Sequence, residues 1–124
     1  MLTPKMIADI AITALDNKNA KDIVLLRTTD VTVLADYFVI CTANSSIHLK
    51  TLGDELEKAL KDNDEMPRRR EGHRSGGWLL LDYACVIVHI FLQETREFYT
   101  LERLWSDAEV IEVESLVSNK GGLS

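Results

Sequence analysis

The 124-residue sequence is poor in cysteine: it has two, Cys41 and Cys85. Both lie in apolar runs typical of strands, where a thiol behaves as a small buried hydrophobic group. This pattern excludes a disulfide framework and gives no zinc-binding spacing. The sequence also lacks any apolar run of about 18 residues and any basic segment ahead of a long apolar one. We therefore expect a soluble, cytoplasmic protein.

An excess of basic residues is also absent, since the formal net charge is -6 and the pI is near 5.0. A phosphate backbone repels such a chain, which argues against nonspecific coating of DNA. The charge is unevenly distributed, because residues 97–114 hold six acids against one base. A basic patch lies elsewhere, and we expect either a solvated loop edge there or a contact with phosphate or an acidic protein. The patch consists of Arg68, Arg69, Arg70 and Arg74.

Motifs for phosphoryl transfer and thiol catalysis are missing as well. No expected strand carries an Asp-x-Asp pair to hold magnesium ions, and the segment 43–46 has no glycine for a nucleotide-binding loop. Neither cysteine has a basic neighbour in sequence that would lower the pKa of its thiol. We therefore predict no catalytic residue, no metal site and no cofactor.

The apolar residues recur at helical spacing in three segments and form β-branched or aromatic runs in five others. The expected order is α-β-β-α-β-β-β-α, an α+β fold in which helices pack on one mixed five-stranded sheet. We expect residues 1–114 to form a single domain and residues 115–124 to form a disordered tail. The expected helices are 4–17, 46–62 and 99–105, and the expected strands are 22–28, 36–43, 67–72, 78–83 and 86–92.

The last two expected strands are separated by so few residues that they must pair as an antiparallel hairpin. The strand 67–72 contains a proline and consecutive arginines, which suit the edge of a sheet. Side chains alternate along a strand, so two faces of the sheet are predicted here. Trp78, Leu80 and Asp82 are expected on one face, and Leu79, Leu81 and Tyr83 on the other. Helices should cover one face and leave the other to meet a partner. The sequence leaves open which face this is.

Six motifs occur along the chain in one order and spacing. They are Asp36-Tyr37-Phe38-Val39-Ile40, Ser45-Ser46, Glu71-Gly72, Trp78-x-x-Leu81-Asp82-Tyr83, Val88-His89 and Arg96-x-x-Tyr99-x-Leu101-Glu102-x-Leu104-Trp105-x-x-Ala108. Together they closely resemble the Iojap/RsfS family, the ribosomal silencing factors, over about residues 5–108. One position departs from the family pattern, because the usual Gly-Asp after the tyrosine is Ala84-Cys85 here. A tight turn needs a positive φ, so alanine predicts a different turn or strain of about 1 kcal/mol.

The resemblance implies a non-catalytic protein with a reduced nucleotidyltransferase-like topology. Such a protein would bind the large ribosomal subunit through its fourteenth ribosomal protein and block joining with the small subunit. It would thereby repress translation under nutrient limitation, as part of a stress response. The resemblance also implies a homodimer when the protein is free.

A steric blocker needs a compact binding site, and such sites favour tryptophan, tyrosine and arginine. Carboxylates beside the rings are natural acceptors for a basic ribosomal protein. Core packing is the alternative for each ring, and a hydrogen-bonded core histidine is the default interpretation of His89. The predicted partner-binding residues are Trp78, Leu80, Asp82, Tyr83, Glu71, Asp36, His89 and Tyr99.

Two other functions stay open from the sequence. An RNA-binding ribosome-assembly factor would contact ribosomal RNA through the arginine patch, and its binding would depend steeply on salt. A nucleotidyltransferase-like enzyme would fit the implied topology, but the missing loop and carboxylate pair oppose it.

Overall fold

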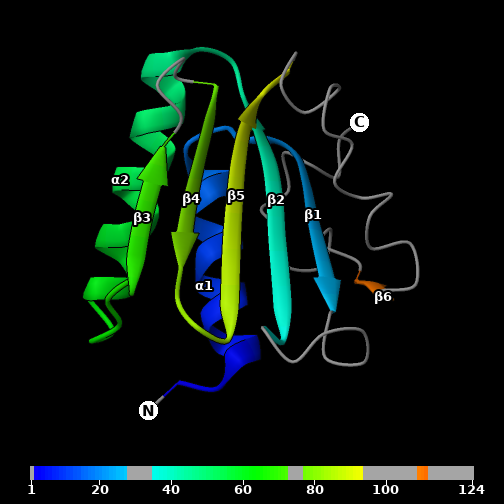
Figure 1. Ribbon diagram of the computed structural model, residues 1–124, viewed down its shortest axis with the longest axis vertical. Coiled ribbons are helices and arrows are strands. Elements are labelled where there is room, and N and C mark those ends of the chain that lie inside the picture. The colour runs from blue at the N-terminus through cyan, green and yellow to red at the C-terminus, as the bar shows by residue number, and fades with distance from the viewer. Residues whose placement is uncertain (1, 28–34, 73–76, 94–108, 112–124) are drawn as a thin grey trace.

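The computed structural model describes residues 2–27, 35–72, 77–93 and 109–111. Six strands form one sheet in the order β3-β4-β5-β2-β1-β6, and the two described helices lie on one side of it (Figure 1). The elements are α1 (Pro4–Asn17), β1 (Lys21–Arg27), β2 (Tyr37–Ala43), α2 (Ser46–Lys61), β3 (Arg69–Gly72), β4 (Trp78–Asp82), β5 (Val86–Leu92) and β6 (Glu109–Ile111).

This architecture confirms the predicted α+β fold with a mixed sheet. All five expected strands are present, and β3 lies at the sheet edge as the proline and arginines indicated. The structure adds β6, which pairs with β1 over only three residues. So short a strand leaves no alternating pattern to read in the sequence. The expected helix 99–105 and the expected tail 115–124 lie outside the described residues.

Both helices begin where the sequence supplies a capping side chain. The Thr3 hydroxyl accepts a hydrogen bond from the Met6 N–H at 3.2 Å, and a proline occupies the first turn of α1. The Ser45 hydroxyl accepts from the His48 N–H at 3.1 Å and caps α2 in the same way. These caps fix the start of each helix, and the apolar stripe of each helix faces the sheet. Neither described helix combines the length and the apolar character needed to cross a membrane.

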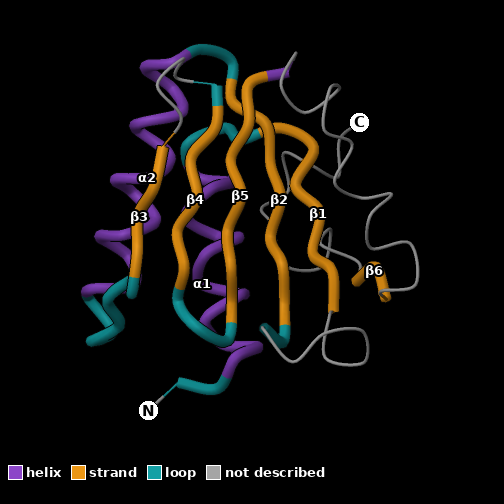
Figure 2. The backbone as a smooth tube through the Cα atoms, in the orientation of Figure 1, coloured by secondary structure: helices purple, strands orange, loops and turns teal. Residues whose placement is uncertain are grey.

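The strand pairing brings residues from five strands into rows across the sheet. β4 and β5 pair antiparallel, as the short connection predicted, and Leu80 lies opposite His89. β2 and β5 pair in parallel, so Ile40 lies on the other side of His89. The row continues to Glu71 of β3 and to Val24 of β1. Figure 2 shows these five strands side by side. Residues of one row point to the same side of the sheet, which fixes the side chains that share a face.

Each face of the sheet has its own hydrophobic cluster, which explains why the central strands are apolar along most of their length. The larger cluster packs the sheet against the helices and includes Leu81, Val88 and Leu56. The smaller cluster lies on the opposite side, where no helix of the described residues lies, and we call this side the helix-free face. It consists of Leu26, Ala35, Phe38, Ile40 and Phe91, with Val24, Trp78 and Ile87 packed against it. The alternation predicted for β4 is therefore confirmed, with Trp78 facing away from the helices.

Candidate partner-binding face

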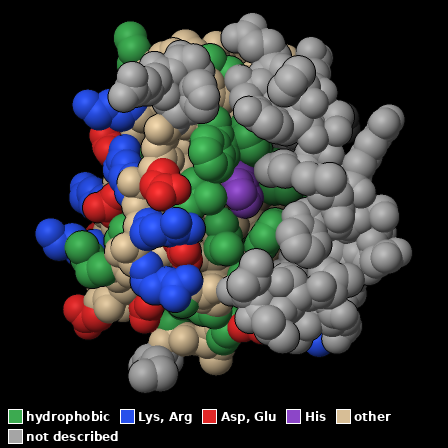
Figure 3. Space-filling view, in the orientation of Figure 1, with side chains coloured by type: hydrophobic (Ala, Val, Ile, Leu, Met, Phe, Trp, Pro, Cys, Tyr) green, Lys and Arg blue, Asp and Glu red, His purple; other side chains and the backbone are tan. Residues whose placement is uncertain are grey.

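Four rings gather on the helix-free face, and we call them the ring cluster: Phe38, Trp78, His89 and Phe91. Trp78 lies directly opposite Phe91 in the β4–β5 pairing, and His89 lies two residues before Phe91. The Trp78 ring is 6.3 Å from both the His89 and the Phe91 ring, at interplanar angles of 15° and 17°. In Figure 3 hydrophobic side chains surround a histidine on this face. The cluster thus gives the helix-free face an aromatic centre.

Two buried polar atoms of the ring cluster lack a hydrogen bond in the described part of the chain. Trp78 Nε1 and His89 Nδ1 are buried and have no hydrogen-bond partner among the described residues. His89 is 9% exposed, and this burial lowers the pKa of its imidazole to about 4. His89 is therefore neutral near pH 7. It is buried as a core histidine should be, but the hydrogen bond expected for it is missing at Nδ1 within the described part of the chain.

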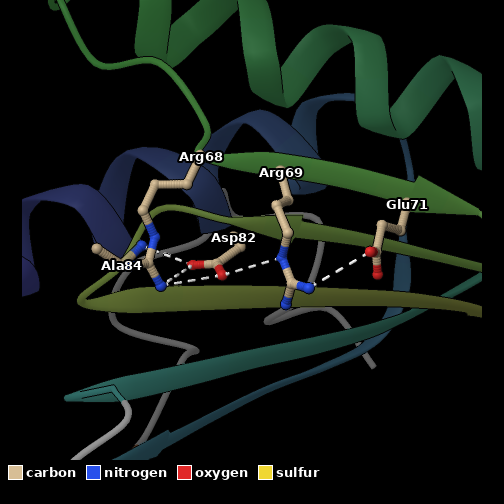
Figure 4. Close-up of polar contacts among 5 residues, drawn as sticks. All are labelled: Arg68, Arg69, Glu71, Asp82 and Ala84. Carbon is tan, nitrogen blue, oxygen red and sulfur yellow. Dashed lines mark hydrogen bonds and ion pairs between the residues drawn. The ribbon is translucent and has the colours of Figure 1, made fainter.

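The Asp82 carboxylate lies at the hairpin end of β4 and is held by two arginines of its own chain (Figure 4). Arg68 Nη2 donates to both oxygens of Asp82 at 3.1 and 3.2 Å, and Arg69 Nε lies 3.6 Å away. The Ala84 N–H donates to the same carboxylate at 2.8 Å. Burial alone would raise the pKa of Asp82, but these donors outweigh it and lower the pKa below its ordinary value. Asp82 is charged and already has partners.

The other described arginines of the basic patch, Arg69 and Arg70, are paired with carboxylates as well. Arg69 Nη1 donates to Glu71 at 3.4 Å on the helix-free face. Arg70 points to the other side of β3, where it lies 2.9 Å from Asp54 and 3.0 Å from Glu57 of α2. Three guanidinium groups thus meet four carboxylates, those of Asp82, Glu71, Asp54 and Glu57. Arg74 lies outside the described residues.

Of the other predicted contact residues, Tyr83 lies on the opposite side of the sheet. Tyr83 is 4% exposed and belongs to the cluster beneath the helices, and burial raises the pKa of its hydroxyl. The backbone N–H of Asp36 donates to the Cys85 carbonyl at 2.7 Å, at the hairpin end of the sheet. Tyr99 lies outside the described residues. The structure therefore brings together five of the predicted residues on the helix-free face: Trp78, Leu80, Asp82, Glu71 and His89.

The hairpin corner contains the residue that departs from the family pattern. Ala84 has a φ of 70°, the left-handed conformation that the turn was predicted to need. An alanine there costs about 1 kcal/mol relative to glycine. The hydrogen bond from its N–H to Asp82 holds the corner in this conformation. Asp82 therefore acts on the turn as well as on the arginines.

Sequence reasoning predicted Trp78 and Leu80 but missed the other apolar residues of the face. Ile87 and Phe91 share the face of His89, since they lie two residues to either side of it in β5. Alternation along β5 could have identified both. Phe38 could not be found in this way, because its place beside Ile87 depends on the parallel pairing of β2 with β5.

Comparisons with known proteins agree on one family. The chain matches the family model described as "Ribosomal silencing factor during starvation" over residues 2–122. It is 35% identical over 109 residues to the ribosomal silencing factor RsfS of Halalkalibacterium halodurans, which covers 88% of this chain and 93% of that protein. It is 34% identical over 101 residues to "Mitochondrial assembly of ribosomal large subunit protein 1" of Mus musculus, covering 79% of this chain and 44% of that protein. A crystal structure of a Chromobacterium violaceum protein superposes with a TM-score of 0.81 at 33% identity, covering 85% of this chain and 88% of that one.

Proposed function

The chain belongs to the family of ribosomal silencing factors, and from this premise we propose that it binds the large ribosomal subunit and keeps the small subunit from joining. The contact is made with the fourteenth protein of the large subunit. Translation falls as a result when nutrients are scarce, and the protein acts in the cytoplasm. The same proposal includes a homodimer of the free protein. The name of the mouse relative, which refers to assembly of the large ribosomal subunit, supports this subunit as the partner.

The observation that supports this proposal best is the ring cluster on the helix-free face. Trp78 is half-buried at the start of β4, beside buried Leu80 and His89. Aromatic side chains in a water-poor centre supply much of the binding energy at protein interfaces. Charged side chains border this centre along β3, as Figure 3 shows. An apolar centre with a polar rim is the usual anatomy of a protein–protein contact.

A basic ribosomal protein fits this rim through Glu71 and the net charge of -6. The Glu71 side chain is 50% exposed, whereas that of Asp82 is 4% exposed and held by its arginines. We therefore assign the direct acceptor role to Glu71. Asp82 supports the contact by fixing the arginines and the hairpin corner. Steric blocking requires no catalytic residue, so binding to this face would be sufficient for function.

The test is sedimentation of ribosomes with the added full-length protein. Wild type should shift joined ribosomes toward free subunits and co-migrate with the large one. Trp78→Ala should weaken large-subunit binding by about 30-fold, since loss of a central interface tryptophan costs about 2 kcal/mol. Ile47→Ala is the matched control, because Ile47 is a large apolar residue that is 81% exposed at the start of α2. It should behave as wild type. The proposal is wrong if the wild-type protein neither binds large subunits nor frees them.

A further inference from the structure

His89 lies at the centre of the ring cluster, on the middle strand of the three that carry it. Its ring is 5.3 Å from Phe38, 6.0 Å from Phe91 and 6.3 Å from Trp78. We propose that His89 is a positioning residue for Trp78, and that its ring fixes the plane in which the indole meets the ribosomal partner. This inference rests on the proposed function, because it concerns the same face.

The geometry distinguishes the two residues by exposure. His89 is 9% exposed and flanked in its row by Leu80 and Ile40, so little of it can reach a partner. Trp78 begins β4 and is less buried. The rings of Trp78, His89 and Phe91 lie within 17° of one another. The indole therefore lies in a plane set by two rings on β5.

No hydrogen bond within the described residues fixes the indole instead. Trp78 Nε1 lacks a partner there, as does Nδ1 of His89. A ring that lacks a hydrogen bond keeps its orientation only through its packing neighbours. The backbone of β5 is paired on both sides, by β4 and β2, and holds His89 rigidly. Removal of the imidazole should therefore free the indole without displacing the strand.

The test uses the full-length chain with Trp105→Phe, which leaves Trp78 as the only tryptophan. In this background His89→Ala should lower large-subunit affinity roughly two- to twelvefold, the range expected for one aromatic pair. The fluorescence anisotropy of Trp78 should fall as well, because the indole gains freedom. His89→Phe, which restores a flat ring, should recover both the affinity and the anisotropy. Ile87→Ala, on the same strand and face but outside the ring cluster, should leave the anisotropy unchanged.

Two results would overturn the positioning role while the proposed function stands. One is a His89→Ala variant that binds the large subunit with wild-type affinity while the Trp78→Ala variant has lost binding. The other is a His89→Phe variant whose large-subunit affinity and Trp78 anisotropy are as low as those of His89→Ala. Wild-type binding by Trp78→Ala would instead exclude this face as the ribosomal contact, and the positioning role with it. If His89→Ala does not fold, His89→Leu takes its place, since leucine keeps the bulk and lacks the flat ring.

Discussion

Among single residues, Asp82 connects the largest number of features of the site. Its carboxylate is almost fully buried, yet it accepts from Arg68 and from the Ala84 N–H, and it lies beside Arg69. A buried charge is tolerated only when it is paired and hydrogen-bonded. Asp82 meets this condition entirely with groups of its own chain. It stabilises the hairpin corner in a conformation that alanine disfavours.

The pairing of Asp82 predicts a pH-dependent stability. Asp82→Asn should lower the free energy of unfolding at pH 7 by about 1–3 kcal/mol, because the buried donors lose a charged acceptor. The folded-state pKa of Asp82 is lowered, so its stabilisation is fully present above the unfolded pKa of about 4 and is lost as the pH falls through the folded pKa. The gap between wild type and variant should therefore shrink below about pH 4. Urea unfolding at pH 7, 5, 4 and 3 measures it.

Glu71→Gln is the control for this titration. The Glu71 side chain is 50% exposed and pairs with Arg69 at 3.4 Å, so its loss should change stability by less than about 1 kcal/mol at any pH. A gap between wild type and Asp82→Asn that stays constant from pH 7 to pH 3 would contradict a charged, paired Asp82.

Among the elements, α2 packs closely on the sheet because of one glycine. Gly53 lies on the buried face of α2, between Leu52 and Leu56. A Cβ at this position would overlap Leu79 Cδ2 and would lie 3.2 Å from Arg70 Nη2. Glycine inside a helix costs about 1 kcal/mol relative to alanine. The close approach to β4 is the physical reason for this residue.

We expect Gly53→Ala to destabilise the protein by about 1–3 kcal/mol, even though alanine is the better helix former. Leu79 is 6% exposed and has little room to move away from an added methyl group. Leu79→Val should make room, so the double variant should lose less stability than the two single losses combined. Urea unfolding of the four proteins measures this cycle. Full additivity of the two losses would exclude a clash between the positions.

The sequence predicted these elements where their signals are local. The leucines of α2 recur at helical spacing, and four of them are buried: Leu49, Leu52, Leu56 and Leu60. The partners of the arginines could not be predicted in this way. Arg68 meets Asp82 fourteen residues along the chain, and Arg70 meets Glu57 thirteen residues back. Such contacts depend on how separate elements pack, which no periodicity encodes.

The same distinction between local patterns and contacts of separate elements applies to the candidate site. Alternation along β4 correctly separated Trp78 from Tyr83, since it is a property of one strand. Tyr83 was nevertheless predicted as a contact because tyrosine is a common interface residue, a criterion that takes no account of the face. The structure places its ring beneath the helices. Composition indicated which residue types bind, and only the fold shows which of them share a surface.

At the scale of the whole molecule, the pairing of charges distinguishes binding to a ribosomal protein from binding to ribosomal RNA. The arginines that made β3 look basic are neutralised by carboxylates within the described structure. A guanidinium already paired gains less from a phosphate and releases fewer counterions there. The net charge of -6 works in the same direction. These observations favour a protein partner over ribosomal RNA.

Large-subunit binding should therefore depend weakly on salt. Each phosphate contact adds roughly 0.7 to 0.9 to the slope of log affinity against log salt, so contacts by three arginines would give a slope of about -2 to -3. We expect a slope smaller in magnitude than about 1.

The triple variant Arg68→Gln, Arg69→Gln and Arg70→Gln should leave this slope unchanged. Its stability should fall, because Asp82 loses its arginine partners. Affinities are therefore compared for the folded fraction, with Lys58→Gln and Lys61→Gln of α2 as a charge-loss control. A steep wild-type slope that the arginine substitutions reduce by two or more units would instead indicate an RNA-binding assembly factor.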